Sequence, residues 1–144
     1  MLFMSTFKQK LVSFFRVSDL PPKARAYMEG EGLLFVAERL RITVVYHRLK
    51  APGRNFRHKH ETVWGSLAIS EKRIVGYAFR KKIIHLPFDE PKAKSIKLSC
   101  VNSKVLVLAF DPAVFNPKHS GNMEIRYHFD RAPEAYGIIK NLID

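Results

Sequence analysis

Hydrophobic and polar residues alternate with the period of a β-strand through the middle of the chain. In residues 65–70, Leu67 and Ile69 alternate with small or polar residues, as in a strand buried on one face. Residues 73–79 and 83–88 continue this pattern as a second and a third strand, separated by charged turns. A meander of three strands leaves an apolar face and two open edges, which the rest of the chain must cover.

Strands are also predicted before this meander. Residues 33–49 are rich in β-branched and aromatic residues, which strands favour, and a bend is expected near Glu38 and Arg39. A long, bent first strand can pair in two places and begin to close a barrel. Residues 50–61 contain Pro52-Gly53 and are predicted to form a loop.

After the meander, residues 95–101 and 104–110 predict a hairpin, and residues 111–122 predict a long loop. Residues 123–129 alternate most clearly, because every second residue from Met123 to Phe129 is apolar or aromatic. That pattern predicts a strand with one face on the core and one face in water.

Both ends of the chain have helical periodicity. Residues 133–143 place five apolar side chains on one stripe, with Pro133 and Glu134 in the first turn, where proline and an acidic residue stabilise a helix. Gly137 is interpreted as permitting close approach of this helix to the sheet. Residues 3–17 predict a short amphipathic helix, followed at 18–32 by a linker with two prolines. In the predicted helix at 3–17, the residues expected to anchor the chain to a membrane or a partner are Phe7, Leu11, Phe14 and Phe15.

The fold class is therefore predicted to be mostly β: an antiparallel barrel of about seven strands, closed by a C-terminal helix and preceded by an N-terminal helical extension. The chain of 144 residues is expected to form one domain at 30–144, after an N-terminal helix and linker at 1–29. No apolar run approaches the roughly 20 residues that span a bilayer. With a single cysteine, Cys100, this favours a cytoplasmic protein, with peripheral membrane association left open.

Positive charge is concentrated in the first part of the chain. The net charge is +12, and residues 1–82 carry 17 Lys/Arg against 6 Asp/Glu, a net charge of +11. Residues 39–60 contain seven Lys/Arg and no acidic residue. This asymmetry indicates a surface for an anionic partner. The predicted anion-binding residues are Arg48, Lys50, Arg54, Arg57 and Lys59.

No pattern typical of catalysis or metal binding is found in the sequence. His58 and His60 are two residues apart, but no cysteine or carboxylate cluster completes a metal shell, so they are interpreted as solvated. Cys100 is interpreted as a small buried hydrophobe. Nucleophile elbows, phosphate loops and paired carboxylates are missing from the sequence. We therefore expect neither an enzyme nor a cofactor.

The order of elements resembles the pleckstrin-homology-like (PH-like) superfamily, in particular its GRAM and bacterial PH-like members. The resemblance covers residues 30–143. It rests on the segments EGLL at 31–34, GSLAISEKRIVGYAF at 65–79, IIHLPFDEPKAKSIKL at 83–98, MEIRYHF at 123–129 and APEAYGIIKNLI at 132–143. Gly65, Leu67, Arg73, Ile74 and Tyr77 occupy the positions of the family's Gly-x-Leu strand, Arg and apolar-aromatic strand. The resemblance implies a non-catalytic binding module whose basic loop, here 48–60, meets anionic lipid or an acidic protein.

Three binding functions remain open from the sequence. The first is an anionic membrane surface or an acidic partner bound by the basic loop. Each cation near an anionic leaflet contributes about 1 kcal/mol, so four would give only about millimolar affinity, and the N-terminal helix is the candidate for a second contact. The second is protein interaction or homo-oligomerisation through sheet edges and the N-terminal helix. The third, less favoured, is nucleic acid stacked on Phe56 and Trp64, although Trp64 is also expected in the core.

Overall fold

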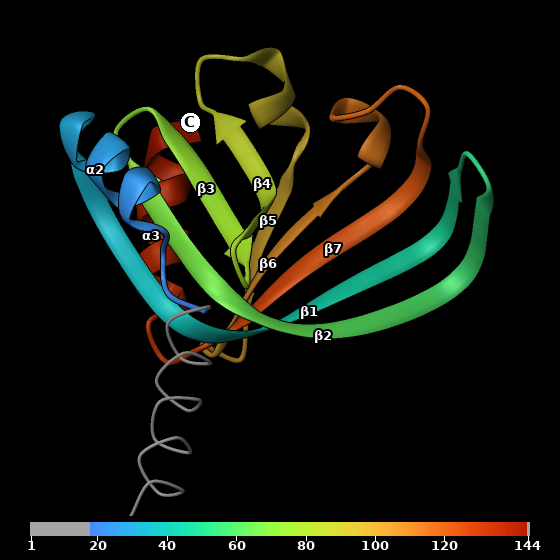
Figure 1. Ribbon diagram of the computed structural model, residues 1–144, viewed down its shortest axis with the longest axis horizontal. Helices are drawn as coiled ribbons and strands as arrows, with labels where there is room; N and C mark the ends of the chain where they lie inside the picture. Colours follow the sequence, from blue (N-terminus) through green and yellow to red (C-terminus); the bar gives the residue numbers. More distant parts are fainter. Residues whose placement is uncertain (1–17, 144) are drawn as a thin grey trace, which may run out of the picture.

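The computed structural model describes residues 18–143, with the side chains of 51 and 54–56 left aside. Its main part is a strongly curved β-sheet with helices against it (Figure 1). The elements, in chain order, are α2 (Pro22–Gly30), β1 (Leu33–Ala51), β2 (Arg54–Ser70), β3 (Arg73–Ala78), β4 (Lys81–Pro87), η1 (Pro91–Ser95), β5 (Lys97–Val101), β6 (Val105–Phe110), η2 (Pro112–Val114), β7 (Ser120–His128) and α3 (Ala132–Ile143). The predicted N-terminal helix lies outside the described residues.

The described strands form one seven-stranded sheet in the order β4-β3-β2-β1-β7-β6-β5. All neighbouring strands are antiparallel. The mostly β class and the strand number are confirmed, but the predicted closure into a barrel is wrong. β4 and β5 are the two edges of the sheet, and the chain passes between them through η1. This helix begins at Pro91, and proline has no backbone N–H group to donate to a neighbouring strand.

The first strand is long and bent, as predicted. It pairs with β2 over its whole length and with β7 from Arg41 onward, so it belongs to both halves of the sheet. The pairing with β2 shifts register between Ala37 and Leu40. Arg39 lies at this shift with φ 58°, a backbone conformation that non-glycine residues seldom adopt. This irregularity lets one strand serve both halves of the curved sheet.

The predicted loop at 50–61 is wrong, because those residues continue β1 and β2 through a turn of two residues. Ala51 pairs with Arg54 across Pro52-Gly53, and Gly53 has φ 73°. Tight hairpin turns require such a positive φ, and glycine supplies it without steric cost. The loop was predicted from the proline and the basic residues, which are also compatible with a hairpin of two paired strands.

The core lies on the concave side of the sheet, and α3 packs against it. The helix buries Ala132, Ala135 and Ile139, and the other members of its predicted stripe, Ile138, Leu142 and Ile143, pack partly buried against the core. Strand β7 buries Ile125 and Tyr127 on the same side, with Met123 and Phe129 packed at the margin of the cluster. The predicted face of β7 is therefore confirmed, and the helix fills one end of the curved sheet (Figure 1).

The predicted linker at 18–32 contains a helix, α2, which packs on the outer face of the sheet. Pro22 occupies its first turn, where the missing N–H is tolerated. Leu20 and Met28 form a second apolar cluster with Ala68 of β2 and Val75 of β3. The two prolines therefore begin this helix.

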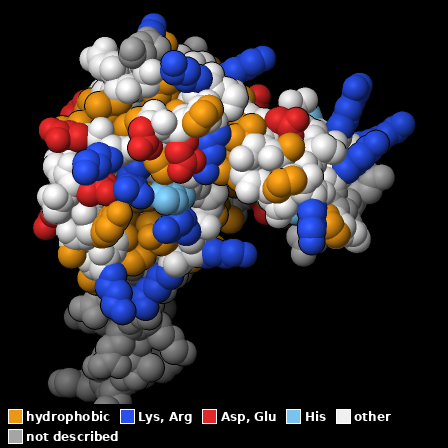
Figure 2. Space-filling view, turned by 90° about the horizontal axis from the view of Figure 1, so that it is seen from above, with side chains coloured by type: hydrophobic (Ala, Val, Ile, Leu, Met, Phe, Trp, Pro, Cys, Tyr) orange, Lys and Arg blue, Asp and Glu red, His pale blue; other side chains and the backbone are white. Residues whose placement is uncertain are grey.

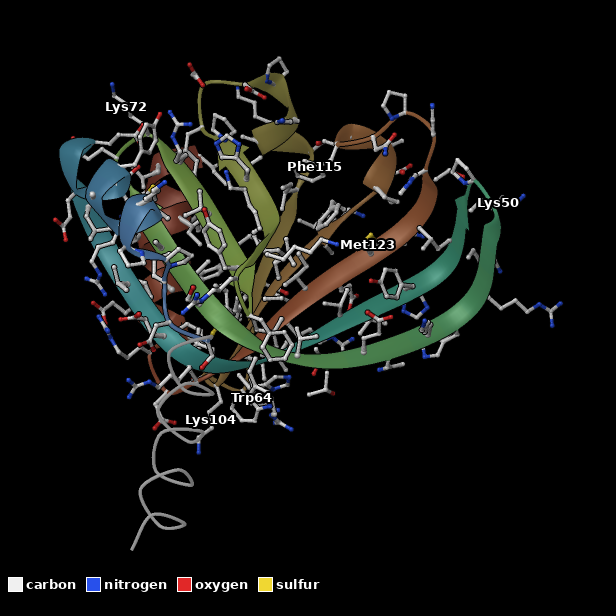
Figure 3. The ribbon with its side chains drawn as sticks, in the orientation of Figure 1. Lys50, Trp64, Lys72, Lys104, Phe115 and Met123 are labelled. Atoms are coloured by element: carbon white, nitrogen blue, oxygen red, sulfur yellow. The ribbon has the colours of Figure 1, made fainter. Side chains whose placement is uncertain are left out.

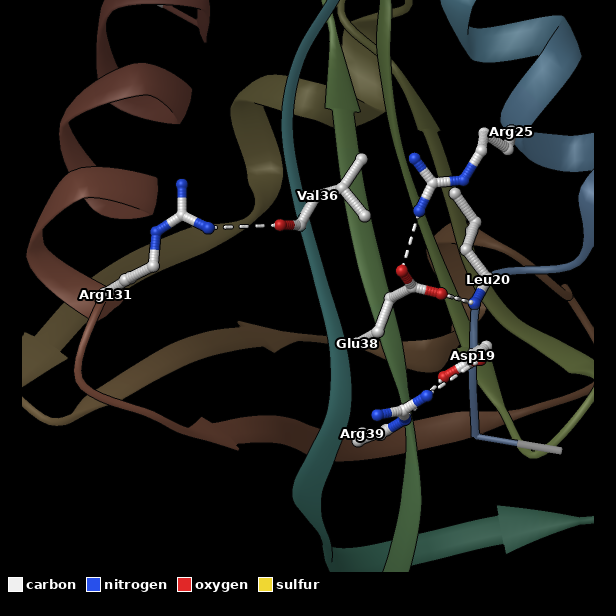
Figure 4. Close-up of polar contacts among 7 residues, drawn as sticks. All are labelled: Asp19, Leu20, Arg25, Val36, Glu38, Arg39 and Arg131. Atoms are coloured by element: carbon white, nitrogen blue, oxygen red, sulfur yellow. Dashed lines mark hydrogen bonds and ion pairs between the residues drawn. The ribbon is translucent and has the colours of Figure 1, made fainter. Parts of the chain in front are cut away.

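The carboxylate of Glu38 on β1 holds α2 and the residues that precede it in position. Glu38 accepts the backbone N–H of Leu20 at 2.7 Å and the guanidinium of Arg25 at 2.7 Å (Figure 4). Beside it, Arg39 pairs with Asp19 at 2.9 Å. Because the bend in β1 presents consecutive side chains to this segment, strand and helix are joined by polar contacts as well as by apolar packing.

Replacing Tyr127 by Phe is expected to stabilise the protein by about 1 kcal/mol. The Tyr127 hydroxyl is buried without a hydrogen-bond partner in the described part of the chain, a cost that Tyr127→Phe removes. Urea unfolding followed by circular dichroism measures the change. Tyr46→Phe is the control, because the Tyr46 hydroxyl donates to Glu61 and its removal should not stabilise. A loss of stability in Tyr127→Phe would contradict the prediction and indicate a buried water at this hydroxyl.

Candidate functional site

The β1–β2 hairpin extends past β3, while β7 pairs with its β1 side as far as Lys50. β3 pairs with β2 only between Gly65 and Ile69, so residues 54–64 of β2 continue past the β3–β4 turn with β1 as their one neighbour. At about 3.3 Å per residue, this extension is about 35 Å long. We call residues 41–51 of β1 and 54–64 of β2 the arm; it is the long cyan and green hairpin in Figure 1.

The arm carries all five of the predicted anion-binding residues: Arg48, Lys50, Arg54, Arg57 and Lys59. Of these, Arg48, Lys50 and Arg57 are exposed, and no ion pair joins them to an acid of residues 18–143. Lys59 pairs with Glu61 at 3.0 Å, and the side chain of Arg54 is outside the description. Lysine and arginine side chains project from the end of the arm (Figure 2), and Lys50 lies at its tip (Figure 3).

A bulge on the arm determines the position of Arg48. The register between β1 and β7 shifts between His47 and Lys50, and Arg48 has φ 51°. Gly121 of β7 lies opposite with φ 121°, where an added Cβ would approach the Arg48 carbonyl carbon to 2.9 Å. Bulges redirect side chains out of the regular alternation. Arg48 is thereby presented at the arm's surface.

Three histidines lie in contact on one face of the arm. His47 faces His58 with their Nδ1 atoms 3.1 Å apart, and the Nε2 atom of His58 contacts that of His60. Exposure of His58 and His60 is confirmed, but they lie on a strand. Partial desolvation, together with positive charge on His60 and His47, lowers the pKa of His58. Because His58 faces its two neighbours through different ring nitrogens, the three rings do not converge on one ion, and residues 18–143 contain no group of ligands arranged for a metal.

An apolar pocket of about 1080 Å³, which we call the groove, lies between the arm and the β3–β4 turn. Its floor is formed by Val44, Tyr46 and Val63 of the arm with Met123 and Ile125 of β7. Met123 lies on the concave side of the sheet in Figure 3. The cationic rim consists of Arg80, Lys81 and Lys82, and Glu61 and His119 complete the polar lining. Such a combination suits a ligand with an apolar part and an anionic part.

The β3–β4 turn presents an aromatic side chain beside these cations. Phe79 is 39% exposed and has φ 57°, and its N–H donates to the carbonyl of Trp64 at 2.7 Å. Strained positions of this kind occur where the surrounding structure enforces them, often at functional sites. The sequence analysis did not select Phe79. Its signal is the run FRKK at 79–82, an aromatic residue followed by three cations at a turn.

The remaining predicted contact residues do not join this site. The anchor residues Phe7, Leu11, Phe14 and Phe15 lie outside the described residues. Trp64, expected in the core, is instead 40% exposed. It lies on the face of β2 opposite the groove, because its neighbour Val63 lines the groove and successive side chains alternate. Cys100 is half-buried at the margin of the core, and Val101 beside it is exposed.

No protein-family model matches the chain. No match was found among curated proteins. Within residues 18–143, the helices are too short or too polar to cross a bilayer. The resemblance to the PH-like superfamily therefore stays a prediction that rests on the sequence pattern.

Proposed function

We propose that this chain is a non-catalytic binding module that attaches to anionic membrane lipid through the arm. The observation that carries the proposal is the exposure of Arg48, Lys50 and Arg57 on a hairpin whose β2 edge extends about 35 Å past β3. Exposed cations on such a hairpin can meet a flat anionic surface. A positive field of this kind also speeds encounter with such a surface.

We also propose a PH-like fold. The seven antiparallel strands, the bent β1 shared by both halves of the sheet and the C-terminal α3 support this assignment. The resemblance implied an anion-binding segment between the first two strands, and the arm stands in that place. A hairpin replaces the expected loop, so we propose recognition of surface charge in preference to one headgroup stereochemistry.

The arm requires a second contact to hold the protein at a membrane. Three cations at about 1 kcal/mol each give about 3 kcal/mol, which is weaker than millimolar affinity. Phe79 supplies a second contact at the β3–β4 turn, since burying a phenylalanine contributes about 1.5–3 kcal/mol. Arg80, Lys81 and Lys82 follow it in the chain, a combination typical of segments that enter an anionic interface. The N-terminal residues Phe7 and Phe14 remain predicted anchors.

Sedimentation with phosphatidylcholine vesicles, with and without phosphatidylserine, tests the proposal. The double variant Lys50→Gln with Arg57→Gln is expected to bind acidic vesicles about 30-fold more weakly, because about 2 kcal/mol is lost. The matched control, Lys97→Gln with Lys104→Gln, removes the same charge from exposed positions on and beside β5 and should change binding by less than about twofold. High salt should weaken binding by the unmodified protein.

Three results would contradict the proposal. Recovery of the unmodified protein in the supernatant with both kinds of vesicle would exclude membrane attachment. Equal losses in the arm variant and its control would show that net charge alone, without the arm, governs binding. Binding of single-stranded RNA by the protein, without binding of acidic vesicles, would assign the arm to nucleic-acid binding instead.

A second candidate function, assembly with another chain, is favoured by the exposed edge of β2. Residues 54–64 pair with β1 on one side only, so their outer backbone groups can accept another strand. Arg57 and Lys59 lie along this edge, and charged side chains there oppose uncontrolled pairing. Light scattering after size exclusion discriminates the two functions, because an oligomer of fixed mass supports assembly and a monomer opposes it.

A further inference from the structure

A second cavity lies between α2 and the outer face of β3 and β4, and we call it the α2 cavity. Its volume is about 320 Å³. Its lining consists of Lys23, Ala24, Tyr27 and Met28 from the helix and Arg73, Val75, Tyr77, Lys82 and His85 from the strands. Met28 and Val75 belong to the outer apolar cluster and form its wall. Figure 2 shows lysine, arginine and histidine side chains over the body of the molecule, interspersed with acidic ones.

An irregularity in β4 brings two of these side chains to the same face. Lys82 and His85 are three residues apart, so a regular strand would direct them to opposite faces. The register between β3 and β4 shifts between Gly76 and Tyr77, and this adds one residue to β4. The bulge therefore lets both side chains reach the α2 cavity.

Arg73 fixes the orientation of the imidazole. Its guanidinium donates to the Glu31 carboxylate at 2.7 and 3.0 Å and to Nε2 of His85 at 2.9 Å. The ring of Tyr27 lies 5.1 Å from the same guanidinium. An arginine side chain only donates hydrogen bonds, so Nε2 of His85 is the acceptor and the ring proton of the neutral imidazole lies on Nδ1. Nδ1–H is left as a donor without a partner among residues 18–143.

The α2 cavity therefore presents donors and positive charge. Besides His85, with its Nδ1–H, the lining residues include Tyr77, whose hydroxyl pKa is raised by burial, and the cationic Lys23 and Lys82. Of the nearby carboxylates, Glu31 is engaged by Arg73 and by the hydroxyl of Ser70 at 3.0 Å, and Glu90 pairs with Lys92 at 2.9 Å. An anion with several oxygens finds donors from both the helix and the strands.

We propose that the α2 cavity binds a phosphomonoester, held by Lys23, Lys82 and the Nδ1–H of His85. Phosphate offers three exposed oxygens, each able to accept a charge-assisted hydrogen bond. The volume accommodates the phosphate with a small organic group. This site is separate from the arm, and it shares Lys82 with the cationic rim of the groove. The ester belongs either to a small compound in solution or to a lipid headgroup.

The electrostatics of His85 provide a direct readout. Burial, followed by the charges of Lys82, Arg73 and Lys92, lowers the pKa of His85, and Glu90 opposes this only in part. A bound dianion adds negative charge beside the ring and should raise that pKa. A rise of the His85 pKa in nuclear magnetic resonance titrations with inorganic phosphate or glycerol 3-phosphate is therefore expected, with a saturable shift that sodium chloride does not reproduce.

Variants locate the site. Lys82→Met and His85→Phe are each expected to weaken glycerol 3-phosphate binding by at least about tenfold, since each removes a donor to a charged group. His85→Asn, which keeps an amide donor close to Nδ1, should retain more binding than His85→Phe. The control is Lys94→Met, an exposed lysine outside the cavity, which should bind as the unmodified protein does. Thermal unfolding without ligand checks that each variant is folded.

Vesicles containing phosphatidic acid separate the two sources of the phosphate. Saturable binding of glycerol 3-phosphate supports a ligand in solution. Binding only to phosphatidic acid vesicles supports a headgroup, provided that His85→Phe weakens it and the arm variant with Lys50→Gln and Arg57→Gln does so less. The proposal is overturned if neither probe shifts the His85 resonance, or if Lys94→Met weakens binding as strongly as Lys82→Met does.

Discussion

Gly65→Ala is expected to destabilise the protein by about 4 kcal/mol or more, a large part of the stability of a domain this size. Gly65 is the position on β2 at which pairing with β3 begins, opposite Ala78. A Cβ there would overlap the backbone carbonyl of Tyr77, with the carbonyl carbon at 2.7 Å and the Cα of Ala78 at 3.0 Å. All of these are backbone atoms, so no side-chain rotation can relieve the overlap.

The expected mechanism is loss of the β2–β3 pairing next to the β3–β4 turn. The same region holds the hydrogen bond from Phe79 to the Trp64 carbonyl, which positions the turn beside the groove. Urea unfolding monitored by circular dichroism should show a variant that is partly unfolded in buffer. If Gly65→Ala were within about 1 kcal/mol of the unmodified protein, the close approach of the two strands would be refuted.

Gly137→Ala is the matched control. A Cβ at Gly137, inside α3, meets no atom within 4 Å, so the expectation that this glycine permits close approach to the sheet is wrong. In open space within a helix, alanine should stabilise by about 1 kcal/mol. The two glycine substitutions are thus expected to change stability in opposite directions, which separates backbone crowding from a general intolerance of alanine.

The features that were predictable from sequence depend on neighbouring residues. The alternation around Leu67 and from Met123 to Phe129, and the helical stripe ending in Ile143, follow from burial of one face of a strand or helix. Closure of the sheet depends on whether β4 meets β5, two edges separated along the chain by η1. No local pattern encodes that distance, so the barrel prediction failed on closure although the strands were found.

The basic residues were identified from the composition of the sequence, but the paired hairpin that carries them was not predicted. Arg48 and Arg57 have the charge expected of a loop, yet paired strands also carry charged side chains on solvated faces. The α2 cavity was missed for a different reason. Its central contacts join Glu31, Arg73 and His85, which are up to 54 residues apart and acquire meaning only when α2 packs on β3. The resemblance drew attention to Arg73 as a strand-start residue and gave it no partner.

The partly buried pair between Glu31 and Arg73 yields the second large effect. Arg73→Met is expected to destabilise by about 3 kcal/mol, because it leaves the Glu31 carboxylate, 11% exposed, without its cation. Arg126→Met, which breaks a pair whose arginine is 38% exposed, should cost less than about 1 kcal/mol. Urea unfolding at neutral pH compares the two. Equal losses in both variants would contradict the special role of the Arg73 pair.

The dependence on pH distinguishes loss of the ion pair from loss of packing. Burial raises the pKa of Glu31, but hydrogen bonds from Arg73 and Ser70, together with the charge of Arg73, outweigh this and hold it below the usual range. A carboxyl group with a lowered pKa stabilises the fold above its ordinary pKa of about 4.3, and that contribution is lost as pH falls through the folded value. The deficit of Arg73→Met relative to the unmodified protein should therefore shrink at acid pH. If packing of the arginine stem were responsible, Arg73→Met would lose the same unfolding free energy at neutral and at acid pH. Adding Glu31→Gln to Arg73→Met would then recover none of the lost stability.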